Sequence, residues 1–338
     1  MRTLGPLAFA AVIGVGAALL PVSNPAGAAS KPAAPAWTCP AGPFTDPVPS
    51  GATITRVPFA LPSDAYNGHG TLNANVEGPV WRNGSLFVSE FGGGPNPERS
   101  RVVKITGGSG TVFNATAGTN GLAVDSAGVL YGASQKAGGI VRFGAPGTAP
   151  SVVVAKFMGK RFNSPNDLAI RSDGTIYFTD PTYQAPQPAP QALTRVYRVA
   201  PHTHTVTVVD ADRVQPNGIT LSPDEQSLYL ATKSGLYEYA VHADGTVGDA
   251  VPFATQVPSG DGMVADCAGN LYVASTNVVV LTPDGETADV LPMPAGAGTI
   301  TNVAFGGADH TTLFVTAMGN GNARGVFKVK LNVPGLPY

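Results

Sequence analysis

Six polar residues recur along the chain, each just before a short apolar run that leads into a turn. The set contains two carboxylates and four carboxamides: Glu77, Asn120, Asn166, Asn217, Asp261 and Asn302. Their oxygen atoms are hard ligands, which suit Ca²⁺ with water completing a shell of about six to eight oxygens. The set contains no His or Cys, which disfavours a Zn²⁺ site. If the fold gathers these residues, they predict a divalent-cation site.

Several of these positions have an alternative explanation as turns. Asn-Gly and Asp-Gly are common turn dipeptides, and they occur at Asn120-Gly121, Asn217-Gly218 and Asp261-Gly262. Each repeat already has its own hairpin turn further along, such as Asp173-Gly174, and a turn gives no reason for Glu77 at the matching place. The recurrence therefore favours a shared site over independent turns.

The elements that must position these residues are β-hairpins. Residues 164–180, SPNDLAIRSDGTIYFTD, contain two short β-branched and aromatic runs joined by a Ser-Asp-Gly turn. Five further segments align with this one, and the polar residues of successive copies lie 41 to 51 positions apart. A period in the forties, with two clear strands and room for two more, is typical of propeller blades. The sequence thus predicts an all-β, six-bladed β-propeller with four-stranded antiparallel blades over residues 51–338.

The propeller fold predicts where the six residues lie. The innermost strand of each blade lines the central channel, and the next strand returns antiparallel to the same face. Because each polar residue stands immediately before an innermost strand, we expect all six at one mouth of the channel. Glu90 and Asp180, at the ends of second strands, should lie behind them. His69, in a YNGHG segment before the first repeat, could also reach the mouth.

The composition agrees with many short strands and tight turns. The chain has 42 Gly, 31 Pro and only 12% charged residues. The formal net charge is −2 at pH 7 and no basic run stands out, which argues against nucleic acid or an anionic membrane as a partner. No Gly-x-Ser-x-Gly motif opens a helix, so a nucleophile elbow is not expected. The expected partner is a small-molecule substrate, and the expected state is a monomer.

The N-terminal residues predict export. Residues 1–28 combine Arg2, an apolar run that Pro21 interrupts near its end, and small residues at 26–28 that a signal peptidase accepts. We expect a secretory signal peptide over these residues, an Ala/Pro-rich, loosely ordered leader over residues 29–50, and a secreted, extracellular protein. A membrane anchor is the alternative interpretation of the apolar run.

Two further features could tie the chain ends together. The two cysteines, Cys39 in the leader and Cys267 in the fifth repeat, would staple the leader to the propeller as a disulfide, with two free thiols as the alternative. Residues 53–60 alternate as a strand and are predicted to pair with residues 325–331. Such pairing would close the ring and remove open sheet edges.

The motifs around the six polar residues, taken in order, resemble a known protein family. They read EGPVW at 77–81, SPNDL at 164–168, PNG at 216–218, DGM at 261–263 and NVAFGG at 302–307. This ordered set resembles the senescence marker protein/gluconolactonase family, the regucalcin-like proteins. The resemblance implies a six-bladed propeller with one divalent metal near the channel mouth, and often lactone hydrolysis.

The resemblance also implies roles for individual residues. It places the metal ligands at Glu77, Asn166, Asn217 and Asp261, with Asn120 and Asn302 lining the pocket. Ca²⁺ is the expected ion, and Zn²⁺, Mn²⁺ or Mg²⁺ are alternatives because family members accept several metals. The family's sugar-lactone enzymes commonly carry an Arg just before the Asn-Asp pair, where this chain has Ser164-Pro165.

Three functions fit these predictions. The first is a metal-dependent lactonase, in which Asp261 is the general base and Asn120, Asn302 and His69 contact the substrate. The second is hydrolysis of phosphotriesters at the same site, since an oxygen-ligated cation polarises P=O as well as C=O. The third is a non-catalytic ligand-binding propeller, in which Ca²⁺ is structural.

Overall fold

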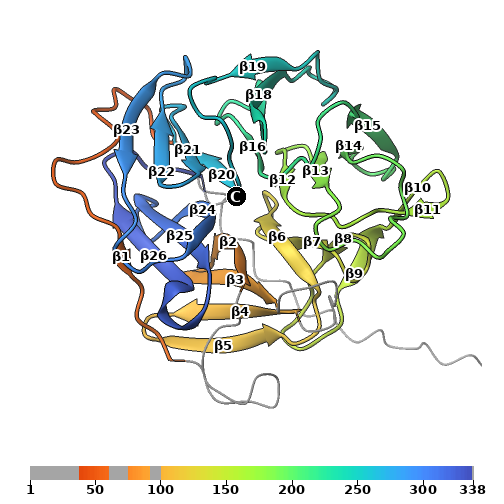
Figure 1. The fold of residues 1–338 in the computed structure, drawn as a ribbon, viewed down its shortest axis with the longest axis horizontal. Helices are drawn as coiled ribbons and strands as arrows, with labels where there is room; N and C mark the ends of the chain where they lie inside the picture. Colours follow the sequence, from red (N-terminus) through yellow and green to blue (C-terminus); the bar gives the residue numbers. More distant parts are fainter. Residues whose placement is uncertain (1–37, 61–74, 92–99, 337–338) are drawn as a thin grey trace, which may run out of the picture. The chain divides into compact units, whose positions relative to one another are not determined.

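Six four-stranded antiparallel sheets form the blades of a propeller (Figure 1). The computed structural model describes residues 38–60, 75–91 and 100–336. The all-β, six-bladed fold predicted from the repeat is confirmed. Within these ranges the strands are accompanied by a short 3₁₀ helix, Gly321–Ala323, and no helix is long and apolar enough to cross a membrane.

Each blade follows the chain outward from its innermost strand. Blade 1 is β2 (Asn75–Arg82), β3 (Ser85–Phe91), β4 (Ser100–Thr106) and β5 (Ser109–Asn114); blade 2 is β6 (Thr119–Val124), β7 (Leu130–Ser134), β8 (Gly139–Arg142) and β9 (Ser151–Val154); blade 3 is β12 (Leu168–Ile170), β13 (Ile176–Asp180), β14 (Arg195–Val199) and β15 (Val206–Asp210). Blade 4 is β16 (Ile219–Leu221), β17 (Ser227–Thr232), β18 (Gly235–Ala240) and β19 (Val251–Phe253); blade 5 is β20 (Met263–Ala265), β21 (Leu271–Ala274), β22 (Val278–Leu281) and β23 (Thr287–Leu291). A two-stranded sheet, β10 (Lys156–Phe157) and β11 (Lys160–Arg161), lies between blades 2 and 3 in the sequence.

Blade 6 joins the two ends of the described chain. It consists of β24 (Thr299–Gly306), β25 (Thr312–Met318), β26 (Gly325–Lys330) and, as its outermost strand, β1 (Thr55–Arg56). Thr55 pairs with Lys328 and Arg56 with Phe327, so the predicted closure is confirmed, with a strand of two residues. Ala60 then forms a bridge to Ser109 of blade 1. Residues 53–60 therefore link the last blade to the first.

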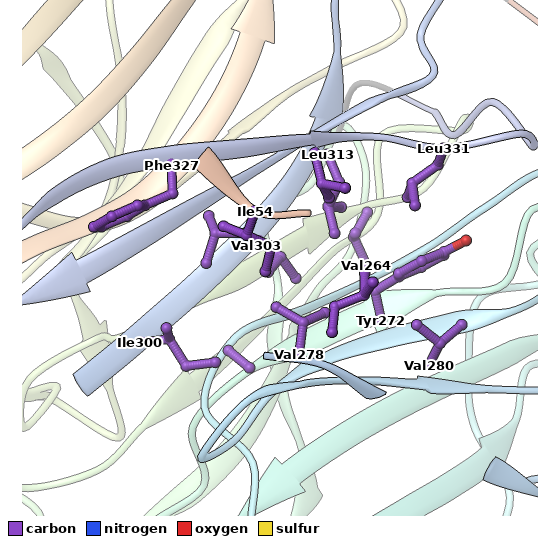
Figure 2. Packing of buried hydrophobic residues seen from close by; sticks show 14 of the residues in the cluster. Ile54, Val264, Tyr272, Val278, Val280, Ile300, Val303, Leu313, Phe327 and Leu331 are labelled. Atoms are coloured by element: carbon purple, nitrogen blue, oxygen red, sulfur yellow. The ribbon is translucent and has the colours of Figure 1, made fainter. Parts of the chain in front are cut away.

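The apolar core is divided among the junctions between blades. Six clusters of buried side chains each combine residues from two neighbouring blades. In β12, Leu168 and Ile170 pack toward blade 2 while Ala169 packs toward blade 4, as the two-residue period of a strand requires. Figure 2 shows the cluster between blades 5 and 6, which Ile54 also enters. The alternating sequence of each hairpin thus places apolar side chains against both neighbouring blades.

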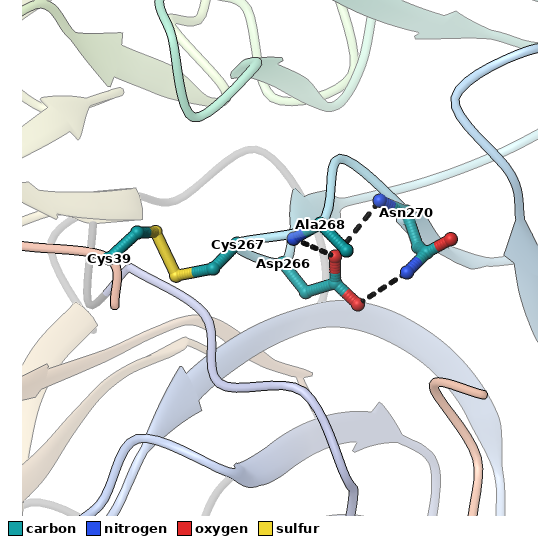
Figure 3. The surroundings of a disulfide bond; sticks show 5 residues. All are labelled: Cys39, Asp266, Cys267, Ala268 and Asn270. Atoms are coloured by element: carbon teal, nitrogen blue, oxygen red, sulfur yellow. Dashed lines mark hydrogen bonds between the residues drawn. A yellow bond between two sulfur atoms is a disulfide. The ribbon is translucent and has the colours of Figure 1, made fainter. Parts of the chain in front are cut away.

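The leader is attached to the propeller through the cysteines. Cys39 and Cys267 form a disulfide with their Cα atoms 5.4 Å apart (Figure 3). Beside it, the Asp266 carboxylate accepts hydrogen bonds from Ala268 N and from both Asn270 N and Asn270 Nδ2 at 2.8 to 2.9 Å, and burial raises its pKa. The turn that carries Cys267 is therefore stabilised both by the disulfide and by the hydrogen bonds to Asp266.

Candidate metal and substrate site

A pocket of about 390 Å³ gathers most of the recurring polar residues. The ring residues that line it are Glu77, Asn120, Asn166, Asn217 and Asp261. The sixth, Asn302, instead lines a smaller cavity of about 30 Å³ among the innermost strands. Residues that are up to 184 positions apart in the sequence therefore meet at one end of the channel.

The strands present these residues in two ways. In blades 3, 4 and 5 the innermost strand begins two residues after Asn166, Asn217 and Asp261, as predicted. In blades 1, 2 and 6, by contrast, the polar residue lies within the strand, next to a shift of register: Glu77 before Val80, Asn120 between Thr119 and Leu122, and Asn302 after Ile300. The prediction that all six precede their strands is therefore wrong for these three blades. A local irregularity of this kind re-aims a side chain without ending the sheet.

The glycines that follow the ring residues allow neighbouring blades to approach closely. A Cβ on Gly218 would lie 2.1 Å from Asp261 O, and a Cβ on Gly121 would lie 2.4 Å from Asp167 Oδ1. Neither glycine has the positive φ of a turn, and Gly121 belongs to β6. The Asn-Gly and Asp-Gly dipeptides are therefore places where one blade packs on the next, not hairpin turns.

Two of the lining residues are carboxyl groups whose pKa values are raised: Glu77 is buried and Asp261 is half-buried. For Glu77, burial is the main cause, followed by repulsion from Asp261 and Asp167. Burial and repulsion from Asp167 raise the pKa of Asp261 to about 8, although a hydrogen bond from Asn217 and the charge of Lys233 act in the opposite direction. Like charges held together away from water favour either protonation or a bound cation.

The carboxamides of the ring supply the remaining oxygen atoms. Asn120 Oδ1 and Asn217 Oδ1 are buried and have no hydrogen-bond partner among the described residues. Buried oxygens without a partner are uncommon and call for an explanation such as an ion or water. Two carboxylates and free amide oxygens form a donor set that fits Ca²⁺. No group of three or more His, Cys, Asp or Glu side chains in the described ranges could hold a metal, so an ion here would depend on the carboxamides.

Asp167 is a site residue that the sequence did not single out. Its Oδ1 accepts a hydrogen bond from Leu168 N at 3.0 Å, and its Oδ2 accepts longer ones from Ile219 N and Asn302 Nδ2 at 3.4 and 3.5 Å. Burial raises the pKa of Asp167 to about 7. The signal was present in the repeat, because the other copies have Gly or Val at this position. Asp167 and Asn302 both line the smaller cavity among the innermost strands.

Two other predicted residues, Glu90 and Asp180, lie outside the pocket lining. Glu90 is buried in β3 and forms an ion pair with Arg101 of β4. Asp180 accepts hydrogen bonds from Asn163 N and Ser164 N, which precede Asn166 in the chain. His69 lies outside the described residues.

Loops and strand ends complete the pocket wall. Tyr183 and Gln184 come from the connection after β13, and Lys233 comes from the turn between β17 and β18. Phe91 ends β3 and Met318 ends β25. Sequence patterns did not identify these residues, because loop residues and the last residues of these strands follow no repeat.

Known proteins that resemble this chain include lactone-hydrolysing enzymes. A gluconolactonase of Zymomonas mobilis is 28% identical over 279 residues, which cover 72% of this chain and 76% of that protein. A lactonohydrolase of Aspergillus oryzae is 30% identical over 211 residues, 53% of this chain and 47% of that protein. The structure of a gluconolactonase from Xanthomonas campestris matches with a TM-score of 0.68 and 29% identity, covering 86% of this chain and 99% of that one.

The match to a protein family extends across all six blades. The model of the family described as SMP-30/Gluconolactonase/LRE-like region matches residues 77–319, from the first ring residue to the end of the last hairpin. The resemblance seen in the ordered motifs is thereby confirmed. This chain belongs to the SMP-30/Gluconolactonase/LRE-like family.

Proposed function

We propose that this protein is a metal-dependent lactonase that opens a small lactone in the channel-mouth pocket. The observation that carries the proposal is the meeting of two carboxyls, Glu77 and Asp261, with the side chains of Asn166 and Asn217 in one pocket, where Asn217 Oδ1 is buried and has no hydrogen-bond partner among the described residues. The similarity to proteins named gluconolactonase and lactonohydrolase supports the same reaction.

The ion in this proposal is Ca²⁺, held by Glu77, Asn166, Asn217 and Asp261. When bound, it supplies a Lewis acid that polarises the lactone carbonyl and stabilises negative charge on its oxygen. The support for these ligands is their convergence on one pocket and the raised pKa values of the two carboxyl groups, which burial and neighbouring carboxylates cause and which a bound cation would lower.

Asp261 is the proposed general base. Hydrolysis adds water to the carbonyl carbon and breaks the bond between that carbon and the ring oxygen. Asp261 takes a proton from the attacking water and returns it to the ring oxygen as that bond breaks, which leaves a hydroxy acid. Asn120 is the proposed substrate contact, and its position in the pocket lining supports this role. Asn302 lines the smaller cavity, where its Nδ2 lies 3.5 Å from Asp167 Oδ2, and its contact with the substrate stays a prediction.

A substrate panel with a single variant tests this function. Aldonolactones, aliphatic lactones and phosphotriesters are assayed with Ca²⁺, Mn²⁺ or Zn²⁺ and with chelator. We expect lactones to be hydrolysed, activity to disappear with chelator, and Ca²⁺ to restore it. The Asp261→Asn variant should keep its fold and lose a factor of about 10² to 10⁴ in kcat.

The control for this experiment is Asp249→Asn, at an exposed position outside the pocket lining. This variant should retain full activity. Undiminished turnover by the Asp261→Asn variant would contradict the proposed role of Asp261 as general base. If no substrate of the panel were turned over with any metal, the proposal that the protein is an enzyme would be rejected.

We also propose that the protein is exported after removal of residues 1–28. The disulfide between Cys39 and Cys267 supports this location, since such bonds persist in oxidising compartments.

A further inference from the structure

The pocket has two chemically different walls. Phe91 of blade 1 and Met318 of blade 6 provide apolar surface on one side. Tyr183, after a strand of blade 3, and Lys233, after a strand of blade 4, come from the other side. In a ring of six, blade 4 lies opposite blade 1 and blade 3 opposite blade 6 (Figure 1). A substrate with one apolar and one polar end would therefore bind between these walls in one orientation.

Lys233 is held at the mouth by a tight hairpin. Thr232 pairs with Gly235, which leaves a two-residue turn of Lys233 and Ser234. Ser234 N donates a hydrogen bond to Thr232 Oγ1, and that hydroxyl lies 3.0 Å from the Gly235 carbonyl oxygen, to which it donates. The backbone that carries the ammonium group is thus fixed relative to the channel.

The Lys233 ammonium lies over an aromatic ring and not against a carboxylate. Its Nζ is 4.9 Å from the centre of the Tyr183 ring, a cation–π contact. Lys233 forms no ion pair or hydrogen bond through its side chain within the part of the chain that the structure describes. The Tyr183 hydroxyl in turn lies 3.4 Å from Gln215 O, which links this loop to the start of blade 4. The three donors of the ammonium group remain available to a ligand.

The balance of charge in the pocket also favours an anion. The charged residues among those that line it are Glu77, Asp261 and Lys233. A divalent cation would compensate the Glu77 and Asp261 carboxylates, so the charge of Lys233 would not be needed to balance them. Lys233 is exposed at the edge of the pocket, where its positive charge attracts an anionic group of a ligand.

Resting on the proposed lactonase function, we propose that Lys233 binds a carboxylate carried by the substrate outside its lactone ring. The pocket is then specific for acidic lactones, with the carboxylate toward blades 3 and 4 and the remainder of the molecule toward Phe91 and Met318. Tyr183 positions the ammonium group. Lys233 supplies the positive charge in this wall, whereas Arg161 hydrogen-bonds to backbone carbonyls and does not line the pocket.

Matched substrate pairs test the proposal. D-Glucono-1,4-lactone and D-glucaro-1,4-lactone differ only in a terminal hydroxymethyl group that becomes a carboxylate, and 5-(hydroxymethyl)oxolan-2-one and 5-oxooxolane-2-carboxylate form a second such pair. We expect the unmutated protein to prefer the acid of each pair in kcat/KM. Lys233→Met should reduce that preference by about tenfold to a hundredfold, mainly through KM, as expected for loss of a charge-assisted contact. Lys233→Arg should preserve most of it.

A control variant and a binding measurement distinguish failure of the Lys233 proposal from failure of the lactonase function. Lys160→Met changes an exposed lysine on β11 and should leave both substrates unaffected. Calorimetry on the Ca²⁺-loaded protein compares gluconate with glucarate, and Lys233→Met should lose the preference for glucarate. Equal losses for both members of a pair, or a shifted pH profile with no change in preference, would overturn the proposal in favour of an effect on Asp261. If no lactone is hydrolysed, the lactonase function fails, and calorimetry alone decides whether Lys233 binds the carboxylate.

Discussion

At the scale of the residue, Asp180 shows how a buried carboxyl can support the site without entering the pocket. Its two oxygens accept hydrogen bonds from Asn163 N and Ser164 N, each at 2.9 Å. Burial raises its pKa to about 7, although these N–H groups and the charges of Arg161 and Arg195 act in the opposite direction. Asp180 therefore orders the backbone that leads to the third ring residue and titrates near neutral pH.

Replacing Asp180 with Asn should change how stability depends on pH. Between the ordinary pKa of 3.8 and the folded value of about 7, the folded chain keeps a proton that the unfolded chain releases. The free energy of unfolding therefore falls as the pH rises through this window, and above the window this group adds no further dependence on pH. The variant should lose less stability over the same window, by up to about 1.4 kcal/mol per pH unit.

Urea unfolding between about pH 4 and pH 8 measures this difference. Chelator in all samples keeps metal binding out of the comparison. The exposed Asp289→Asn variant serves as the control and should follow the unmutated protein. Parallel curves for all three proteins would show that Asp180 does not titrate in this range.

At the scale of the element, the junction between blades 4 and 5 depends on a residue without a side chain. Gly218→Ala would place a Cβ 2.1 Å from Asp261 O, and backbone atoms at that distance must shift. We expect the variant to lose at least about 1–3 kcal/mol of stability. The displacement of Asp261 should also weaken Ca²⁺ binding.

Thermal unfolding and Ca²⁺ titration test Gly218→Ala against Gly108→Ala. A Cβ on Gly108 would meet nothing within 4 Å, so this control should be neutral in both measurements. If Gly218→Ala were as stable as the control, the ring would not depend on close approach between blades.

The repeat made the fold and most of the ring predictable from the sequence. Alternating strands, a period in the forties and one polar residue per copy are local patterns of the sequence. Each corresponds to a feature of the structure, because every blade packs on its neighbours in the same way. The position of Asn302 was not predictable, because it depends on a register shift after Ile300 that no residue type signals. Lys233 and Tyr183 were missed because turns and connections vary between blades.

At the scale of the whole molecule, closure of the ring decides whether the site exists. The residues at the mouth come from every blade, so separation of blades 6 and 1 would open the pocket between Glu77 and Asp261. Three links oppose this separation. The strand β1 pairs with β26, Thr301 Oγ1 donates a 2.6 Å hydrogen bond to Val76 O, and the disulfide fixes Cys39 to blade 5.

Removing the disulfide should weaken closure without abolishing the fold. The bond joins residues 228 positions apart, so it restricts the unfolded chain over most of its length. The Cys39→Ala/Cys267→Ala variant should lose about 2–4 kcal/mol in the free energy of unfolding, with β1 still paired to β26. Reductant should reproduce this loss in the unmutated protein and have no effect on the variant. Mass spectrometry of the exported protein should show oxidised cysteines and a chain that begins near residue 29. An unfolding midpoint that neither mutation nor reductant changes would show that the leader contributes nothing to closure, and β1 with the hydrogen bond of Thr301 would then hold the ring alone.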